Sequence, residues 1–250
     1  MTPGIPAPAL ALDALVGVAV LAWAVLRWAA HQRGRPWPVP RTCSFLLGAG
    51  LVVLAGPAGS ALGGFAGHMV VHLLVGMLAP VALVLEAPVT LALRALPTAR
   101  AVALVRVLRS RPVRALSVPW LARLLDVGGL WVLYCTPLYR AMTTSPAVGL
   151  LVQVHVLFAG CLFAWSVAGP DPVPDRPSVP QRLVVLGVAV AAHAVLAQLL
   201  HAGLLVDVPG PADERMAGAQ LMYWFGDLAE VALALAVLSS WRPVGRPSTA

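Results

Sequence analysis

The sequence has no lysine, few charged residues of any kind and only three cysteines. Charged residues make up 11% of the 250 residues, hydrophobic residues make up 60%, and the mean hydropathy is +0.86. So few polar side chains cannot cover the surface of a water-soluble globular protein, which excludes that class. The hydrophobic residues fall in runs of about 18 to 25, the length that crosses a hydrocarbon layer about 30 Å thick. The sequence therefore predicts an all-α polytopic transmembrane bundle, with residues 1–250 forming a single integral membrane domain.

The cysteines and the basic residues exclude further classes. Cys43, Cys135 and Cys161 are odd in number and have no CxxC spacing, so they predict neither a disulfide framework nor a thiolate zinc site. The formal charge is +7, and all 17 basic residues are arginines that cluster between the apolar runs. Because no solvent-exposed basic domain accompanies this charge, it does not indicate a nucleic-acid partner. The arginines instead report how the chain crosses the bilayer.

The sequence contains seven apolar runs, separated by polar residues, glycines and prolines, and each run is a candidate span. The second run is the weakest because Gly56, Pro57, Gly59, Gly63 and Gly64 interrupt its end. A re-entrant bend at that point, and hence an even number of spans, stays open. The predicted spans are residues 9–30, 44–62, 67–93, 118–139, 147–168, 182–206 and 215–240.

The arginines predict the orientation, because cytoplasmic connections carry the excess of basic residues. With seven spans, 15 of the 17 arginines fall on one side and only Arg140 and Arg215 on the other. We therefore expect the N-terminus outside and the C-terminus in the cytoplasm. The first run has neither a basic stretch before it nor a small-residue cleavage site, so we expect it to be kept as a helix. The longest connection, residues 97–117, is amphipathic and is expected to lie on the inner headgroups.

Ionisable residues inside the spans are the most informative, because holding them in hydrocarbon is costly. His68 and His72 open the third span with i, i+4 spacing, so both imidazoles project from one face and can converge on one ion. The pattern is not the HExxH protease motif, because Met69 stands where the glutamate would be. The alternative is that each histidine only forms a hydrogen bond to another helix.

Three more histidines extend this pattern to other spans. His155 lies on the fifth span, and His193 and His201 lie on the sixth. At 1.5 Å per residue, His72, His155 and His201 would lie about 5–15 Å from the outer rim, with His193 and Asp227 nearer the midplane. We therefore expect imidazoles from three helices to meet in the outer half of the bundle.

The last span carries the polar residues Gln220, Tyr223, Asp227 and Glu230, which fall within an arc of about 80° at about 100° per residue. We expect this stripe to face inward, with Gln198 of the sixth span joining it. Two roles remain open for it. It either supplies acceptors for imidazole N–H groups or an ion path, or it only holds the helices together.

The types of donor favour copper, and Cu(I) above all, because imidazole with thioether or thiol neighbours suits that ion. The soft candidates are methionines and cysteines in or near these spans, although ordinary packing explains each of them better, namely Met69, Met77, Met222, Cys135 and Cys161. Haem is the rival cofactor, because histidines on opposite helices can bind its iron axially. Ion pairing is the expected role of two other carboxylates, Glu86 with Arg94 and Asp126 with Arg123.

Four blocks of the sequence carry a resemblance. They are residues 67–74 (GHMVVHLL), 134–139 (YCTPLY), 155–172, which end in GPDP, and 219–230, which begin with AQLMYW. Together they resemble the bacterial CtaG-like cytochrome c oxidase assembly family of multi-span membrane proteins, over about residues 40–240. One departure is that Tyr134 and Cys135 stand where many relatives have a histidine. Cys135 either replaces that ligand or the ligand is lost.

The resemblance implies a non-enzymatic protein of the bacterial plasma membrane that assists cytochrome c oxidase assembly by binding and delivering copper. Its partners would be oxidase subunits or other copper chaperones. A copper transporter and a membrane redox protein that binds haem or another metal are the alternatives. The implied copper ligands are His68 and His72, then His155, His201 and His193. Weaker candidates, or hydrogen-bond partners of the ligands, are Asp227, Tyr223, Met69, Cys135, Gln198 and Glu230.

Overall fold

The computed structural model describes residues 7–241, which form thirteen helical segments and no strand. The segments are α1 (Ala7–Gln32), α2 (Val39–Leu62), α3 (Gly64–Val71), the π-helical η1 (His72–Leu78), α4 (Ala79–Leu85), α5 (Pro88–Ala95), α6 (Thr98–Leu108), α7 (Arg111–Leu116), α8 (Pro119–Cys135), α9 (Leu138–Thr144), α10 (Pro146–Val167), α11 (Val179–Ala202) and α12 (Ala212–Ser239). The predicted all-α class is confirmed for these residues.

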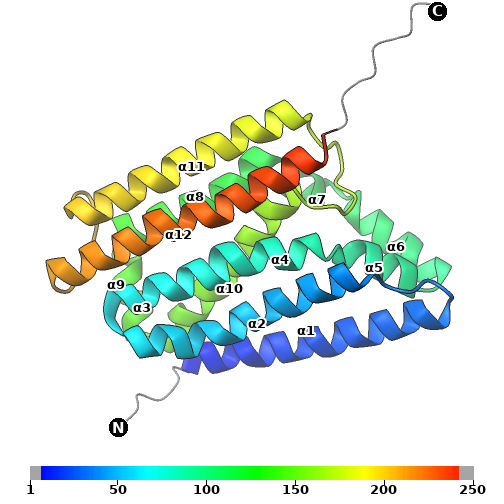
Figure 1. The fold of residues 1–250 in the computed structure, drawn as a ribbon, viewed down its shortest axis with the longest axis horizontal. Helices are drawn as coiled ribbons and strands as arrows, with labels where there is room; N and C mark the ends of the chain where they lie inside the picture. Colours follow the sequence, from blue (N-terminus) through cyan, green and yellow to red (C-terminus); the bar gives the residue numbers. More distant parts are fainter. Residues whose placement is uncertain (1–6, 242–250) are drawn as a thin grey trace, which may run out of the picture.

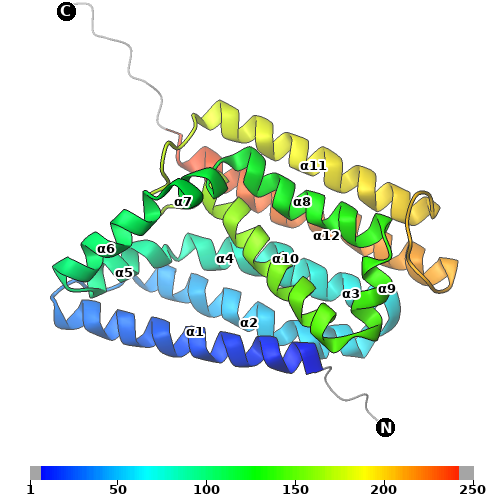
Figure 2. The ribbon, with the colours of Figure 1, turned by 180° about the vertical axis from the view of Figure 1, so that it is seen from behind.

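The long helices form a layered bundle. Helices α1 and α2 lie on one side, α8, α11 and α12 on the other, and α3 and α4 run between them (Figure 1). Most of these helices follow the long axis of the molecule, whereas α10 crosses the bundle obliquely (Figure 2). Because α10 contacts α1, α4 and α8, it joins the two sides. The polar residues of the candidate site lie around this crossing.

Six helices are long and apolar enough to cross a membrane, and a bent pair makes up to seven. The second predicted run is one continuous helix despite Pro57, so the re-entrant alternative is wrong. Proline is tolerated within membrane helices because neighbouring groups satisfy the backbone it frees. The six spans are Pro8–Gln32, Val39–Leu62, Gly64–Ala95, Pro146–Val167, Val179–Ala202 and Ala212–Ser239.

The predicted fourth span, residues 118–139, is not one straight helix. Helix α8 ends at Cys135, and α9 turns away from it by 80°. Thr136 is extended, with φ −132° and ψ 169°, because Pro137 follows it and disfavours the helical conformation there. The Thr136 hydroxyl then accepts a hydrogen bond from the Leu138 N–H at 3.3 Å, which starts the new helix.

The two ends of the bundle differ in charge. The arginine-rich end consists of the α1–α2 connection, α5 to α7 and the α10–α11 connection. The arginine-poor end consists of the α2–α3 turn, α9 and the α11–α12 connection. Of the 15 arginines within residues 7–241, 13 lie at or near the first end, and only Arg140 and Arg215 lie at the second. Arg242 and Arg246, counted in the sequence pattern, lie outside the described residues. The cellular side of each end stays a prediction from this asymmetry.

The outer faces of the helices are apolar. Large hydrophobic side chains such as Leu21, Leu151, Phe158 and Trp224 are exposed on them. Exposed apolar surface on this scale is typical of a protein surrounded by lipid. The protein is therefore a multi-pass membrane protein.

The third span is interrupted near the arginine-rich end. Ala87 takes a left-handed conformation, with φ 66°, between α4 and α5. The Asp171 carboxylate, from the α10–α11 connection, accepts hydrogen bonds from the N–H groups of Val89 (2.8 Å) and Thr90 (2.7 Å) at the start of α5. A buried carboxylate at a helix N-terminus satisfies free donors and opposes the positive end of the helix dipole. Asp171 thereby holds the loop and α5 together.

Neither predicted ion pair of the inner carboxylates is present among residues 7–241. Glu86 instead accepts a hydrogen bond from the Trp23 indole N–H at 3.0 Å. The guanidinium of Arg94 lies over the ring of Trp37, 5.4 Å from its centroid. Glu86 and Arg94 thus contact aromatic rings from α1 and the α1–α2 connection. The spacing of residues along one helix does not predict such contacts, because the rings come from other segments.

Because the Asp171 carboxylate is buried, we expect substitution of Asp171 to lower protein stability more than substitution of Asp175 in the same loop. Asp171→Asn should lower the free energy of unfolding by about 1–3 kcal/mol, because it removes charge-assisted hydrogen bonds from a buried cap. Asp175→Asn should change it by less than about 1 kcal/mol, because the Asp175 side chain is 73% exposed and makes only a surface ion pair with Arg114. Thermal unfolding of the detergent-purified variants measures both. Equal losses of stability would contradict the cap.

Candidate functional site

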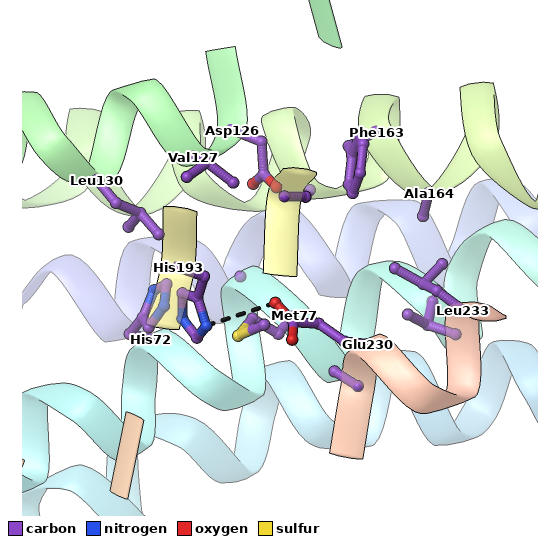
Figure 3. Close-up of a pocket in the computed structure, with 15 residues that line it drawn as sticks. His72, Met77, Asp126, Val127, Leu130, Phe163, Ala164, His193, Glu230 and Leu233 are labelled. Carbon is purple, nitrogen blue, oxygen red and sulfur yellow. Dashed lines mark ion pairs between the residues drawn. The ribbon is translucent and has the colours of Figure 1, made fainter. Parts of the chain in front are cut away.

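A small buried cavity of about 40 Å³ lies at the centre of the bundle. Its polar lining comes from four elements that are far apart in the sequence, as Figure 3 shows. η1 contributes His72 and Met77, α8 contributes Asp126, α11 contributes His193 and α12 contributes Glu230. The cavity is large enough for a water molecule or a single ion.

The three innermost polar side chains lie close together. The ring centroids of His72 and His193 are 6.2 Å apart. His193 Nδ1 lies 3.5 Å from Glu230 Oε1, the contact drawn as a dashed line in Figure 3. All three residues are more than nine-tenths buried. Helices α11, α12 and η1 thus place two imidazoles and one carboxylate on the same cavity.

One atom of each of these side chains has no hydrogen-bond partner within the described part of the chain. The atoms are His72 Nε2, His193 Nε2 and Glu230 Oε2. Leaving a buried polar atom unpaired costs about 1–3 kcal/mol, so such atoms are rare and mark places where a further polar species binds. The three unpaired atoms therefore need a physical explanation that the described side chains do not supply.

Small residues make room for this cluster. A Cβ added to Gly226 of α12 would overlap the His193 ring, and one added to Gly160 of α10 would overlap the Gly76 carbonyl oxygen. Gly76 lies in η1, where the wider π turn carries both His72 and Met77. Segments of π-helix are rare and occur frequently at functional sites. The close approaches of α10 to this turn and of α12 to α11 therefore shape the cavity.

His68 lies in a separate aromatic environment nearer the arginine-poor end. Its Nε2 is 2.9 Å from the Tyr134 hydroxyl, and its ring packs against Phe65 and Tyr139. The Tyr134 hydroxyl is also 3.8 Å from the sulfur of Met69. The i, i+4 pair therefore does not converge on one point. His68 binds Tyr134, and His72 faces His193.

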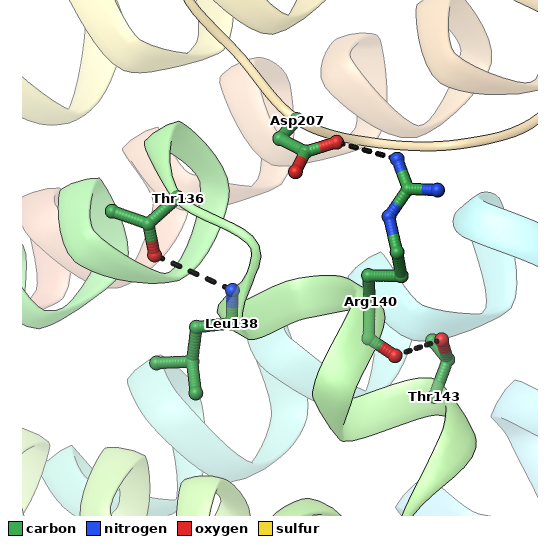
Figure 4. A network of polar contacts seen from close by, with 5 residues as sticks. All are labelled: Thr136, Leu138, Arg140, Thr143 and Asp207. Carbon is green, nitrogen blue, oxygen red and sulfur yellow. Dashed lines mark hydrogen bonds and ion pairs between the residues drawn. The ribbon is translucent and has the colours of Figure 1, made fainter.

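The break between α8 and α9 places the two tyrosines beside His68. Figure 4 shows the contacts around this break. Arg140 of α9 forms an ion pair with Asp207 of the α11–α12 connection at 2.8 Å, and the Asp207 N–H donates to the Tyr134 carbonyl at 2.7 Å. The Thr143 hydroxyl donates to the Arg140 carbonyl at 2.9 Å. These contacts join α8, α9 and the α11–α12 connection where Tyr134 and Tyr139 meet.

Two predicted ligands lie away from the cavity. His155 is exposed on the outer face of α10, where its Nε2 is 3.1 Å from the Leu125 carbonyl oxygen of α8. His201 is half-buried in the last turn of α11, two turns beyond His193, and does not line the cavity. The expected meeting of His72, His155 and His201 is therefore wrong. The oblique path of α10 turns His155 away from the centre.

The polar stripe of the last span does not face inward as a unit. Gln220 is exposed, Tyr223 and Asp227 are half-buried, and only Glu230 reaches the cavity. The buried face of α12 is instead set by small and apolar residues, namely Ala219, Met222, Gly226, Ala229, Leu233 and Val237. Close helix packing selects small residues for that face, so the polar arc lies along its edge.

Two further predicted contributors also lie outside the cavity lining. Gln198 is exposed on α11, which contradicts the prediction that it joins an inward network. Cys135 is half-buried and packs beside the cluster that contains Tyr134, and it does not line the cavity. Within residues 7–241, no three His, Cys, Asp or Glu side chains are arranged as a metal-binding group. A site that uses two imidazoles must therefore draw on other donors as well.

Two cavity residues were not among the predicted ligands. Asp126 was expected to pair with Arg123, and Met77 was treated as packing. An aspartate within an apolar run is itself a signal of function. No comparable signal distinguishes Met77 from other methionines, because its place in the cavity depends on the π turn of η1.

Comparison with known proteins gives a family match over most of the chain. The model of the cytochrome c oxidase caa3 assembly factor family matches residues 19–243, which confirms the resemblance found in the sequence. The uncharacterized proteins Mb0105 of Mycobacterium bovis and MT0111 of Mycobacterium tuberculosis are each 36% identical over 197 residues. The uncharacterized protein ML1998 of Mycobacterium leprae is 31% identical over 196 residues. Each alignment covers 73% of this chain and 30% of the relative, so the chain spans less than a third of their length. No solved structure matches the chain significantly.

Because Gly226 lies against the His193 ring, we expect a methyl group added at position 226 to lower the stability of the protein. Gly226→Ala should destabilise the protein by about 1–3 kcal/mol, because the added carbon must displace the His193 ring or separate α11 from α12. Gly187→Ala, on α11, is the matched control, because an added Cβ there meets no atom within 4 Å. Thermal unfolding in detergent compares the two. A Gly226→Ala protein as stable as the control would contradict the packing described above.

Proposed function

Because the chain belongs to the cytochrome c oxidase caa3 assembly factor family, we propose that it binds Cu(I) at His72 and His193 and delivers this cargo to the oxidase during assembly. The family supports the coarser statement, that this membrane protein takes part in cytochrome c oxidase assembly. The copper site is supported by the chemistry of the cavity. The observation that carries it is the pair of unpartnered Nε2 atoms on facing, buried imidazoles.

The distance between the rings suits a shared ion. Two imidazoles that bind one ion at metal–nitrogen distances of about 2 Å have ring centroids roughly 6 Å apart. The centroids of His72 and His193 are 6.2 Å apart. The pair therefore suits a cation of this size better than a hydrogen bond between the two histidines.

The other donors favour the softer oxidation state. Met77 lies beside Glu230, on the same cavity as the two histidines (Figure 3). Imidazole combined with thioether selects copper, and Cu(I) in particular, whereas a set of oxygen donors alone would select magnesium or calcium. Glu230 faces His193 Nδ1 and orients that ring, as carboxylates do for metal-binding histidines.

The size of the cavity argues against haem as its ligand. Sites for drug-sized and larger ligands typically have volumes of about 300–1,000 Å³. The cavity between His72 and His193 has about 40 Å³ and is lined by residues of six elements. A single ion fits this volume, and a porphyrin does not.

We assign no catalytic reaction to the protein, in keeping with the assembly role of its family. Delivery requires that copper leave the site for a partner, which on this proposal is an oxidase subunit or another copper chaperone. The matched region covers 30% of the length of the relatives. In those proteins, the segments outside the matched region are further candidates for a partner that accepts the copper.

Copper binding provides the direct test. His72→Ala and His193→Ala should each weaken Cu(I) binding by at least about tenfold, because loss of even an outer partner of a metal ligand costs about 10- to 100-fold. His201→Ala, on the same helix as His193 but outside the cavity, should bind like the wild type. Competition of the purified protein with a chromogenic Cu(I) chelator measures all three. Equal loss in the His201→Ala protein, or no loss in the other two, would reject the site.

The assembly role has its own test in cells. Under copper limitation, cells that produce only His193→Ala protein should contain oxidase with less copper than cells with the wild-type protein, as measured by metal analysis of the purified oxidase. His155→Ala is the control, because its ring lies on the outer face of α10. Fully metallated oxidase in the His193→Ala cells would reject delivery even if copper binding were intact.

A further inference from the structure

Two cavities lie in sequence between the arginine-poor end and the cavity of the candidate copper site. The first, of about 400 Å³, lies beside the α2–α3 turn and the start of α1, and its polar lining includes Asp13, Ser60 and Gln153. A second, of about 30 Å³, shares His68 and Gln153 with the first and shares His72 with the third. The third is the cavity that contains His193 and Glu230. The cavities therefore adjoin one another from the end of the bundle to its centre, with His68, Gln153 and His72 as shared lining residues.

Half of the unpaired buried polar atoms lie along the same line. Within residues 7–241, eight buried side-chain atoms have no hydrogen-bond partner. Four of them line these cavities, namely Gln153 Oε1, His72 Nε2, His193 Nε2 and Glu230 Oε2. Unpaired donors and acceptors at successive depths suit a species that moves between them, whereas a purely structural network would pair them with one another.

The opposite side of the copper site is closed by apolar packing. Toward the arginine-rich end, the cavity is followed by a cluster that includes Val84 of α4, Val167 of α10, Val185 of α11 and Val237 of α12. Val167 and Val237 are completely buried. Interiors packed in this way leave no voids as large as a hydrated ion.

Positive charge reinforces this closure. Arg182 of α11 is buried beside the same cluster and donates to the Val167 carbonyl oxygen at 2.6 Å. Arg123 of α8, one turn from Asp126, donates to the Val188 carbonyl oxygen at 2.7 Å. A cation that left the cavity in this direction would approach both guanidinium groups in a medium of low dielectric constant. Toward the arginine-poor end, no arginine is among the described residues that line the two outer cavities.

We propose that the His72–His193 site exchanges its cation with one side of the membrane only, through a passage from Asp13 and Ser60 past Gln153 and His68. The inference rests on the copper site proposed above and adds its route of access. A protein with a single opening takes up and returns its cargo on the same side. It therefore acts as a delivery site and not as a channel or transporter across the bilayer.

Cysteine accessibility tests the passage without copper. Single cysteines are placed in a protein whose Cys43, Cys135 and Cys161 are replaced by alanine, at Ser60 and Gln153 in the passage and at Val167 in the apolar cluster. Thr144→Cys on α9 and Thr98→Cys on α6 mark the arginine-poor and arginine-rich ends, because both positions are exposed. Leu151→Cys, two residues from Gln153 on α10 but exposed on its outer face, is the lipid-facing control.

The probe is a membrane-impermeant cationic methanethiosulfonate, added to intact cells and to inside-out vesicles. Ser60→Cys and Gln153→Cys should react at least about tenfold faster from the side that modifies Thr144→Cys than from the side that modifies Thr98→Cys. Val167→Cys and Leu151→Cys should react from neither side. Ag⁺, a closer match to Cu(I) in size and charge, should reach Ala189→Cys in the central cavity from the Thr144 side alone.

Two results would overturn the passage. One is a Gln153→Cys protein that does not react from the Thr144 side although Thr144→Cys does. The other is modification of Val167→Cys by the methanethiosulfonate, or reaction of Ala189→Cys with Ag⁺, from the Thr98 side. Loss of copper binding in His193→Ala protein together with an inaccessible Gln153→Cys would reject the passage and keep the site. An accessible Gln153→Cys in a protein that binds no copper would reject the site and keep the passage.

Discussion

The cost of holding ionisable side chains inside a lipid-surrounded bundle decides where each polar residue of this chain lies. Almost every arginine is kept at the ends of the helices, and 13 of the 15 described ones are at one end. The polar groups that do enter the interior are each held by a specific partner or gathered in one place. Glu86 binds Trp23, His68 binds Tyr134, and His72, His193 and Glu230 share the central cavity.

Close helix packing is what makes that central gathering possible. Helix α10 approaches η1 through Gly160, and helix α12 approaches α11 through Gly226. An added methyl group would overlap the Gly76 carbonyl oxygen at the first position and the His193 ring at the second. The π turn of η1 places His72 and Met77 on the same cavity. The most polar point of the interior is thus built from its smallest residues. This combination gives a buried cavity of the size of one ion.

The sequence predicted the membrane spans and the family well, because both depend on local signals. The length of an apolar run, the residues that break it and the blocks around His68 and Glu230 can be read without knowing which helices are neighbours. It predicted the ligands less well. The i, i+4 rule placed His68 and His72 on one face, but their partners come from α8 and α11, and the rule has no information about either helix. The expected depth of each residue grouped His72 with His155 and His201. This grouping was wrong because depth in the membrane does not say how each helix is rotated about its own axis.

What the sequence alone determined is the class of the protein, an all-α multi-pass membrane protein of an oxidase assembly family, since hydrophobic length and motif content are properties of the chain. Only the tertiary structure decided which polar residues meet. The oblique path of α10 turned His155 outward, the break after Cys135 brought Tyr134 and Tyr139 to His68, and α12 presented Glu230 and not Gln220 to the centre. The reason is that a contact between helices depends on crossing angle and rotation, which are set by the packing of all the helices together.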